Sequence, residues 1–281
     1  MIKTNIIAEI GINAVSSEKG KDIEKAKNLI NIAALAGVDY VKFQKRDPDT
    51  AVPESKKMES KSVPWRKEPT TYLQYKKDIE FTFDEYQELF QYAQALGVGL
   101  FASVWDIKSA ELMLNITDIV KIPSAHVTNI ELLDFCRHSF KFRILSTGMS
   151  TEYEIEDAVS ALEPHVIMHT NSTYPCPVDQ LNMGYIQWLK EKYIGMQIGY
   201  SNHYYGIVPI MASIYLGANW VEFHITENHE DWGSDQKASI EPAGVFKLVK
   251  GIRDLERAYQ GFGPRDILSG EVKKRKDLSL K

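Results

Sequence analysis

Lysines and serines lie in or beside short apolar runs of this sequence. Lys42 belongs to the run at 40–43 and Lys121 to the run at 119–122. Five serines lie within such apolar runs or shortly after them: Ser103, Ser124, Ser146, Ser172 and Ser201. Ammonium groups supply charge and hydroxyls supply directed hydrogen bonds, so the set favours an anionic ligand with phosphate and carboxylate groups. A Schiff base on Lys42, the device of many barrel aldolases, remains an open alternative.

Two histidines stand at the ends of consecutive apolar runs. His203 and His224 could meet around one divalent cation, with water and a carboxylate completing its shell. Each could equally be a hydrogen-bonded structural residue, and the spacing favours neither reading. The same holds for any single polar residue at a strand end, which can simply cap the next helix.

The elements that would position these residues alternate along the chain. Eight short apolar runs predict strands at 6–12, 40–43, 99–103, 119–122, 143–146, 166–169, 197–200 and 220–224. Segments of helical period separate or follow them, at 21–36, 84–96, 107–114, 130–138, 152–162, 185–193, 207–216 and 242–259. Eight strand–helix units predict an α/β fold, a (β/α)8 TIM barrel in a single domain over residues 1–281. Its functional groups would then gather at the carboxyl ends of the strands.

Composition excludes several classes of protein. The 281 residues are 44% hydrophobic and 25% charged with a net charge of -5, which is typical of a globular domain and argues against nucleic-acid binding. We expect no membrane segment and no cleaved leader, because no apolar run approaches the length of a membrane span. Two cysteines without a metal-site or disulfide spacing fit a reducing cytoplasm.

One segment breaks the alternation of strands and helices. Residues 46–71 are polar and contain four prolines, which predicts a long loop after the second strand. Loops of this length are commonly lids or binding loops, and we place this one over the barrel mouth, with disorder as the alternative. Residues 260–281 are predicted to be a C-terminal tail.

Eight co-linear motifs resemble the sialic acid synthase family, and the match runs from about residue 6 to residue 277. The motifs are AEIGIN at 8–13, VKFQK at 41–45, KIPS at 121–124, LSTGM at 145–149, STYP at 172–175, GYSNH at 199–203, EFHIT at 222–226 and GSDQKASIEP at 233–242. So many motifs in the same order make the resemblance specific.

The resemblance implies a transferase of sialic acid biosynthesis that condenses phosphoenolpyruvate with an N-acetylmannosamine-like sugar aldehyde. The products would be a sialic or other nonulosonic acid and phosphate. Positions that match phosphoenolpyruvate-binding residues of the family are Lys42, Lys121, Ser124, Ser146, Ser172 and Ser201. His203 and His224 match the ligands of a divalent metal, Mn²⁺ or Mg²⁺, and a homodimer is implied. Positions that match contacts to metal-bound water or to the acceptor sugar are Glu9, Gln44, Tyr174 and Asp235.

This chemistry explains the residue types. C3 of phosphoenolpyruvate attacks the aldehyde, which the metal polarises as a Lewis acid, and water adds at C2. The tetrahedral intermediate then loses phosphate by C–O cleavage. In this scheme Lys42 and Lys121 stabilise negative charge and form no imine, while Glu9 or Asp235 orients water or moves a proton.

The chain departs from the family pattern at three places. Asn13-Ala14-Val15-Ser16 replaces the usual Asn-His-Asn-Gly. Ser124-Ala125-His126 replaces a Ser-Gly-Glu whose glutamate is a proposed proton shuttle. His126 either takes over this catalytic role, since its ordinary pKa is near neutral, or fills space and leaves the role to Glu9 or water.

The third departure concerns the acceptor. Many family members continue into an antifreeze-like domain that contacts the acceptor in the partner subunit, whereas this sequence stops at Lys281. We therefore expect that the sugar needs no such contact, that loop 46–71 replaces it, or that another protein supplies it. Two further hypotheses stay open: the same condensation on a modified hexosamine, mannose or a sugar phosphate, and an inactive sugar-binding or scaffold barrel.

Overall fold

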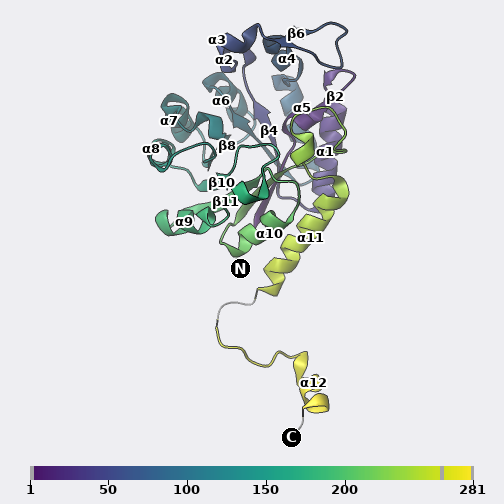
Figure 1. The fold of residues 1–281 in the computed structure, drawn as a ribbon, viewed down its shortest axis with the longest axis vertical. Coiled ribbons are helices and arrows are strands. Elements are labelled where there is room, and N and C mark those ends of the chain that lie inside the picture. Colours follow the sequence, from purple (N-terminus) through teal and green to yellow (C-terminus); the bar gives the residue numbers. More distant parts are fainter. Residues whose placement is uncertain (1–2, 260–262, 280–281) are drawn as a thin grey trace.

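The eight predicted strands form a closed parallel barrel in the computed structural model, which describes residues 3–259 and 263–279 (Figure 1). Around the barrel the order is β1-β12-β11-β10-β9-β8-β7-β4, with β4 closing on β1. The strands are β1 (Asn5–Glu9), β4 (Tyr40–Lys45), β7 (Gly99–Val104), β8 (Ile119–Ile122), β9 (Phe142–Ser146), β10 (Val166–Thr170), β11 (Gln197–Asn202) and β12 (Trp220–His224). The predicted TIM barrel is confirmed.

Helices connect or follow the strands because parallel neighbours need long crossovers. They are α1 (Ile23–Ala36), α5 (Phe83–Ala95), α6 (Ile107–Leu114), α7 (Ile130–Ser139), α8 (Glu152–Leu162), α9 (Tyr185–Lys192), α10 (Val208–Tyr215) and α11 (Pro242–Ala258). Local sequence fixes their ends. Thr82 and Glu85 form a capping box on α5, and Gly37 ends α1 with φ +88°, a conformation that glycine adopts without strain.

The inside of the barrel is apolar at one end and polar at the other. An apolar cluster fills the amino-terminal half: Ile7, Phe101, Ile144, Val166, Met168 and Trp220. Side chains two positions apart on a strand point the same way. The residues two positions after members of this cluster are polar in five cases: Glu9, Ser103, Ser146, Thr170 and Glu222. The apolar cluster therefore supports a polar layer at the carboxyl ends of the strands.

Gly199 in β11 allows this cluster to close. A Cβ atom there would lie 3.0 Å from Met168 Cε and 3.0 Å from Trp220 Cβ. The missing side chain thus leaves room for two large residues at the centre of the barrel.

The first strand is shorter than its apolar run predicted. β1 ends at Glu9, Gly11 has φ +46°, and a short 3-10 turn, η1 (Gly11–Ala14), follows. The predicted strand end at residue 12 was wrong because glycine turns the chain. Asn13 is buried in the turn and donates to Ile225 O and Ser239 Oγ at 2.8 and 2.7 Å, so its role is structural.

The segment at 46–71 is folded and does not form the irregular loop that its prolines predicted. It contains α2 (Pro48–Ala51), α3 (Glu54–Lys57) and a hairpin of β5 (Ser60–Lys61) and β6 (Thr70–Thr71), and α4 (Tyr72–Asp78) follows. We call residues 46–78 the insert. Figure 1 shows α2, α3, α4 and β6 grouped at one end of the molecule, away from the N-terminus.

Aromatic contacts attach the insert to the barrel. Trp65 packs edge-on against Trp232 in the loop after β12, with 4.9 Å between ring centroids. Within the insert, Trp65 Nε1 donates to Asp78 Oδ2 at 3.0 Å, which fixes the indole for this contact. The insert and the loop after β12 are therefore held together.

The described part of the predicted tail contains one helix, α12 (Glu271–Leu278). It has no buried residue and lies apart from the barrel in Figure 1. Residues 260–262 and 280–281 of this predicted tail lie outside the described residues. No helix in the described part of the chain combines the length and apolarity needed to cross a bilayer.

Candidate active site

A cavity of about 290 Å³ opens at the carboxyl ends of the barrel strands. All predicted site residues except His126 line it: Glu9, Lys42, Gln44, Ser103, Lys121, Ser124, Ser146, Ser172, Tyr174, Ser201, His203, His224 and Asp235. They come from strands far apart in sequence, which the closure of the barrel brings together. The expectation that strand-end polar residues share one mouth is therefore met.

The two lysines are buried and paired with glutamates. Lys42 Nζ contacts a carboxylate oxygen of Glu9 and lies 2.9 Å from Ser103 Oγ. Lys121 Nζ lies 2.7 Å from Glu222 Oε1. Burial opposes the charge on Lys42, but Glu222 and Glu9 outweigh it and raise its pKa. Lys42 is therefore an ammonium ion near neutral pH, which disfavours the Schiff-base alternative there.

Glu222 is a site residue that the sequence reasoning missed. Its Oε1 atom accepts from Lys121 and from Ser201 Oγ at 3.1 Å, and lies 3.7 Å from Lys42 Nζ. Burial alone would raise its pKa, but Lys121 and Lys42 lower it to about 2. Strand alternation carried the signal, because Glu222 lies two positions before the predicted ligand His224.

Five serines form an arc along one side of the cavity. They lie on, or directly after, five neighbouring strands, β7 to β11: Ser103, Ser124, Ser146, Ser172 and Ser201. The backbone N–H of Gly148 donates to Ser124 Oγ at 3.0 Å, and a Cβ atom on Gly148 would lie 2.3 Å from Ser172 Oγ. The missing Cβ lets the backbone enter the arc. Ser103 Oγ accepts from Lys42 Nζ and Ser201 Oγ donates to Glu222, so a bound anion would share or replace these contacts.

The other side of the cavity carries the two predicted metal ligands. The rings of His203 and His224 have centroids 5.4 Å apart. The hydroxyl of Tyr174 lies 2.6 Å from His203 Nε2, and the two rings stack. Burial, followed by the field of His224, lowers the pKa of His203 to about 3, so its imidazole is neutral at physiological pH.

His224 has a buried nitrogen without a hydrogen-bond partner. This atom, Nδ1, lies 3.5 Å from Asp235 Oδ2, and the other oxygen of Asp235 accepts from Ser234 Oγ at 2.7 Å. Within residues 3–259 and 263–279, no group of three or more His, Cys, Asp or Glu side chains is arranged around a common metal position. The protein therefore offers two imidazoles and a nearby carboxylate.

His126 does not line the cavity, although the next residue before it, Ala125, does. Its ring packs edge-on against Trp105, with centroids 5.2 Å apart. Burial lowers its pKa below the usual value. The geometry gives no support to the predicted proton transfer by this side chain, which leaves Glu9 and Asp235 as the predicted catalytic groups in the cavity.

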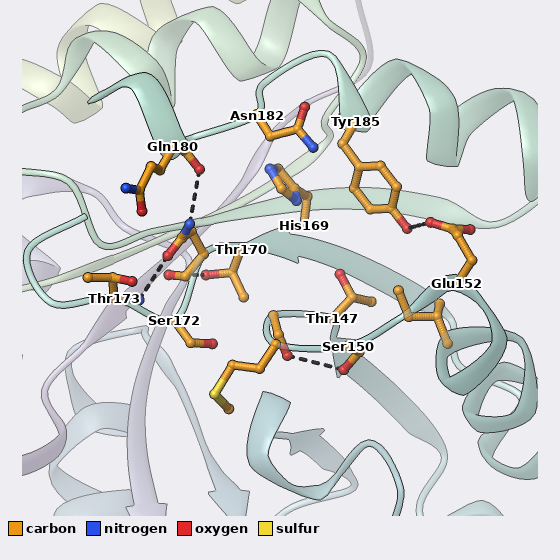
Figure 2. A pocket seen from close by; sticks show the side chains of 14 residues that line it. Thr147, Ser150, Glu152, His169, Thr170, Ser172, Thr173, Gln180, Asn182 and Tyr185 are labelled. Carbon is orange, nitrogen blue, oxygen red and sulfur yellow. Dashed lines mark hydrogen bonds between the residues drawn. The ribbon is translucent and has the colours of Figure 1, made fainter. Parts of the chain in front are cut away.

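A second and larger pocket, of about 580 Å³, adjoins the first between the loops after β9 and β10 (Figure 2). Met149, Thr170 and Ser172 line both spaces. No lysine or arginine lines the second pocket, and its Glu152 already bonds to Tyr185 and Lys192. The smaller cavity is therefore the better site for an anionic substrate.

The closed barrel and its lysine–serine–histidine cavity define a TIM barrel with a site suited to an anionic ligand. A family model described as the NeuB family matches residues 29–263, and the chain belongs to this family.

Named relatives of this family are synthases of nonulosonic acids. The N,N'-diacetyllegionaminic acid synthase of Campylobacter jejuni is 32% identical, over 97% of this chain and 82% of that protein. The human N-acetylneuraminate-9-phosphate synthase is also 32% identical, over 95% of this chain and 74% of that protein. Among solved structures, the N-acetylneuraminic acid synthetase of Leptospira borgpetersenii has a TM-score of 0.82 and 29% identity, covering 98% of this chain and 92% of that one.

Proposed function

We propose that this protein condenses phosphoenolpyruvate with the aldehyde of a hexosamine-type sugar and releases a nonulosonic acid and phosphate. The observation that carries the proposal is the division of the cavity. Two lysines and five serines lie on or just after β4 and β7 to β11, whereas the two histidines and the carboxylates of Glu9 and Asp235 lie on β1, on β12 or in the segments after β11 and β12. The first set suits the phosphate and carboxylate of the donor, and the second suits a polarised aldehyde.

The donor binds through charge and directed hydrogen bonds. The serine hydroxyls donate to phosphate oxygens, the N–H of Gly148 holds Ser124 Oγ in place, and Lys42 and Lys121 balance the charge of the bound anion. Because these groups are fixed by the barrel, they need little reorganisation when phosphate leaves as an anion. Glu9 and Glu222 hold both ammonium groups in place when the donor is absent.

We infer that His203 and His224 hold the divalent cation, Mn²⁺ or Mg²⁺. The residues fit such a site, because His224 Nδ1 is buried without a hydrogen bond and His203 is held neutral by burial. When bound, the cation supplies Lewis-acid polarisation of the aldehyde oxygen. Tyr174 orients the ring of His203 by stacking on it.

Two carboxylates of the cavity can orient water and move protons. Gln44 Nε2 donates to Glu9 Oε1 at 3.0 Å. This hydrogen bond and the contact with Lys42 fix the position of the Glu9 carboxylate in the cavity. Asp235 lies beside His224 and is fixed by Ser234. We propose that Glu9 orients the water that adds to C2 and that Asp235 contacts an acceptor hydroxyl.

The test is an assay of phosphate release from phosphoenolpyruvate labelled with ¹⁸O in the C2–O bridge. Release should need donor, sugar and cation together, and the label should appear in the phosphate because the C–O bond breaks. Release without sugar, release unaffected by a chelator, or label retained in the sugar acid would contradict the proposal. Trapping of a lysine adduct by borohydride would instead favour the Schiff-base mechanism. A cytoplasmic location and a homodimer remain predictions, the latter to be measured by light scattering.

A further inference from the structure

The insert brings two cations to the mouth of the cavity that the predicted site did not include. Arg46 follows β4 directly, and Lys76 lies on α4. Both line the cavity together with Gln44 and Asp235. Arg46 is buried and Lys76 is partly buried. Positive charge is therefore present on the acceptor side of the site as well as on the donor side.

Neither cation forms a salt bridge within residues 3–259 and 263–279. Each lysine at 42, 45 and 121 forms a salt bridge with a glutamate, whereas Arg46 and Lys76 form none with the residues that the structure describes. The guanidinium of Arg46 instead lies 4.2 Å from the ring centroid of Trp105 and donates to Gln44 Oε1. Cations in low-dielectric surroundings are costly without a counter-ion, so a bound anion would stabilise both.

Aromatic rings hold Lys76 in position. Its Nζ atom lies 4.9 Å from the ring centroid of Tyr75 and 5.3 Å from that of Tyr72. Burial and the neighbouring charge of Arg46 lower the pKa of Lys76 to about 8, although Asp235 and Glu80 act in the opposite direction. Lys76 and Arg46 thus repel each other in the free protein, and an anion between them would remove this repulsion.

The position of these cations connects them with the acceptor. Lys42, Lys121 and the serine arc already provide for the charges of the donor, at the closed end of the cavity. Gln44 and Asp235 are predicted to contact the acceptor. Arg46 donates a hydrogen bond to Gln44, and Lys76 lies close enough to Asp235 for their charges to interact. An anion held here would belong to the second substrate.

We propose that Arg46 and Lys76 form a subsite for a phosphate group on the acceptor, so that this enzyme prefers a phosphorylated hexosamine. The inference rests on the proposed function and narrows its acceptor. The relatives do not decide this point. The human relative is named for a phosphorylated product and the Campylobacter jejuni relative for an unphosphorylated one, and each is 32% identical to this chain.

Kinetics with N-acetylmannosamine and its 6-phosphate test the proposal. We expect kcat/KM for the phosphorylated sugar to exceed that for the free sugar by at least about tenfold, as for one charge-assisted contact. Arg46→Gln and Lys76→Met should each reduce this ratio about tenfold by raising KM for the sugar phosphate, with KM for phosphoenolpyruvate unchanged. Lys77→Met is the matched control, since Lys77 lies on the same helix and pairs with exposed Asp49.

Two results would overturn the proposal. One is a wild-type preference for the free sugar, and the other is a rise in KM for phosphoenolpyruvate in the variants, which would assign the cations to the donor. Calorimetric titration of the sugar phosphate separates this inference from the proposed reaction. Binding that is lost in Lys76→Met but kept in Lys77→Met would support the subsite even in the absence of turnover. Absence of binding to a folded wild-type protein would refute it.

Discussion

Lys121 Nζ lies 2.7 Å from Glu222 Oε1, and both side chains are buried where the barrel interior changes from apolar to polar. The same carboxylate accepts from Ser201. Glu222 therefore contacts Lys121 on β8 and Ser201 on β11, and it lies 3.7 Å from Lys42 on β4. A substrate anion would contact the same three residues. Glu222 holds these donors in place and balances their charge until the donor substrate arrives.

Replacing this glutamate should destabilise the protein. Glu222→Gln leaves Lys121 buried without its counter-ion, and we expect the free energy of unfolding to fall by about 3 kcal/mol or more. Asp118→Asn is the control, because it breaks an exposed pair with Lys141 and should cost less than about 1 kcal/mol. Urea denaturation measures both. Equal losses in the two variants would contradict the role of Glu222.

The effect should also depend on pH. The pKa of Glu222 is lowered from 4.5 to about 2 in the folded protein, so its stabilisation is complete above 4.5 and is lost as the pH falls toward 2. The difference in stability between the wild type and Glu222→Gln should therefore be constant from pH 7 to 5 and shrink below 4.5. Urea titrations across this range measure it. A gap that widens on acidification would refute the assignment.

The serine arc can be tested through its backbone. In Gly148→Ala the new Cβ would meet Ser172 Oγ at 2.3 Å, so the hydroxyls must move. We expect KM for phosphoenolpyruvate to rise about tenfold or more, corresponding to one lost charge-assisted contact. Gly184→Ala provides the control, since no atom lies within 4 Å of a Cβ there. Equal kinetics in both variants would show that the arc does not bind the donor.

The metal ligands predict a second pair of variants. His203→Ala should abolish high-affinity binding of Mn²⁺ in a calorimetric titration and lower turnover at least about 100-fold. His138→Ala should change neither, because His138 is exposed on α7. Unchanged cation affinity in His203→Ala would exclude this histidine as a ligand.

His126 gives a prediction in the opposite direction. The ring of His126 packs against Trp105 and does not line the cavity. We therefore expect that His126→Gln keeps kcat within about threefold of the wild-type value and does not change the pH profile of kcat. A proton shuttle at this position would instead require a loss of about 100-fold and a shifted profile. Rates measured from pH 6 to 9 distinguish the two.

Regular alternation made the fold predictable from the sequence. The runs at 119–122 and 220–224 coincide with β8 and β12, and other strands differ by one or two residues at an end. Only the first run was much too long, since Gly11 turns the chain before the apolar residues end.

The site could be predicted only where its residues follow strands. Strand-end serines, lysines and histidines have a position that the barrel defines, and every one of these that was predicted for the site reaches the cavity. Lys76 carried no such signal, because it belongs to an insert whose path depends on contacts such as Trp65 with Trp232. Arg46 follows β4 directly, but it was assigned to the predicted polar loop. His126 was predicted as a site residue from its place in a family motif, but its ring packs against Trp105 and does not line the cavity.

The contact between Trp65 and Trp232 has a kinetic consequence. It joins the insert to the loop that carries Asp235, and both segments contribute residues to the rim of the cavity. The residues proposed to bind phosphoenolpyruvate lie deeper, at the closed end of the cavity. A sugar bound at the rim would block the way to Lys42 and Lys121. Phosphoenolpyruvate must then enter first. A dead-end sugar analogue, which binds the free enzyme as well as the donor complex, should therefore raise KM for phosphoenolpyruvate and also lower the maximal rate.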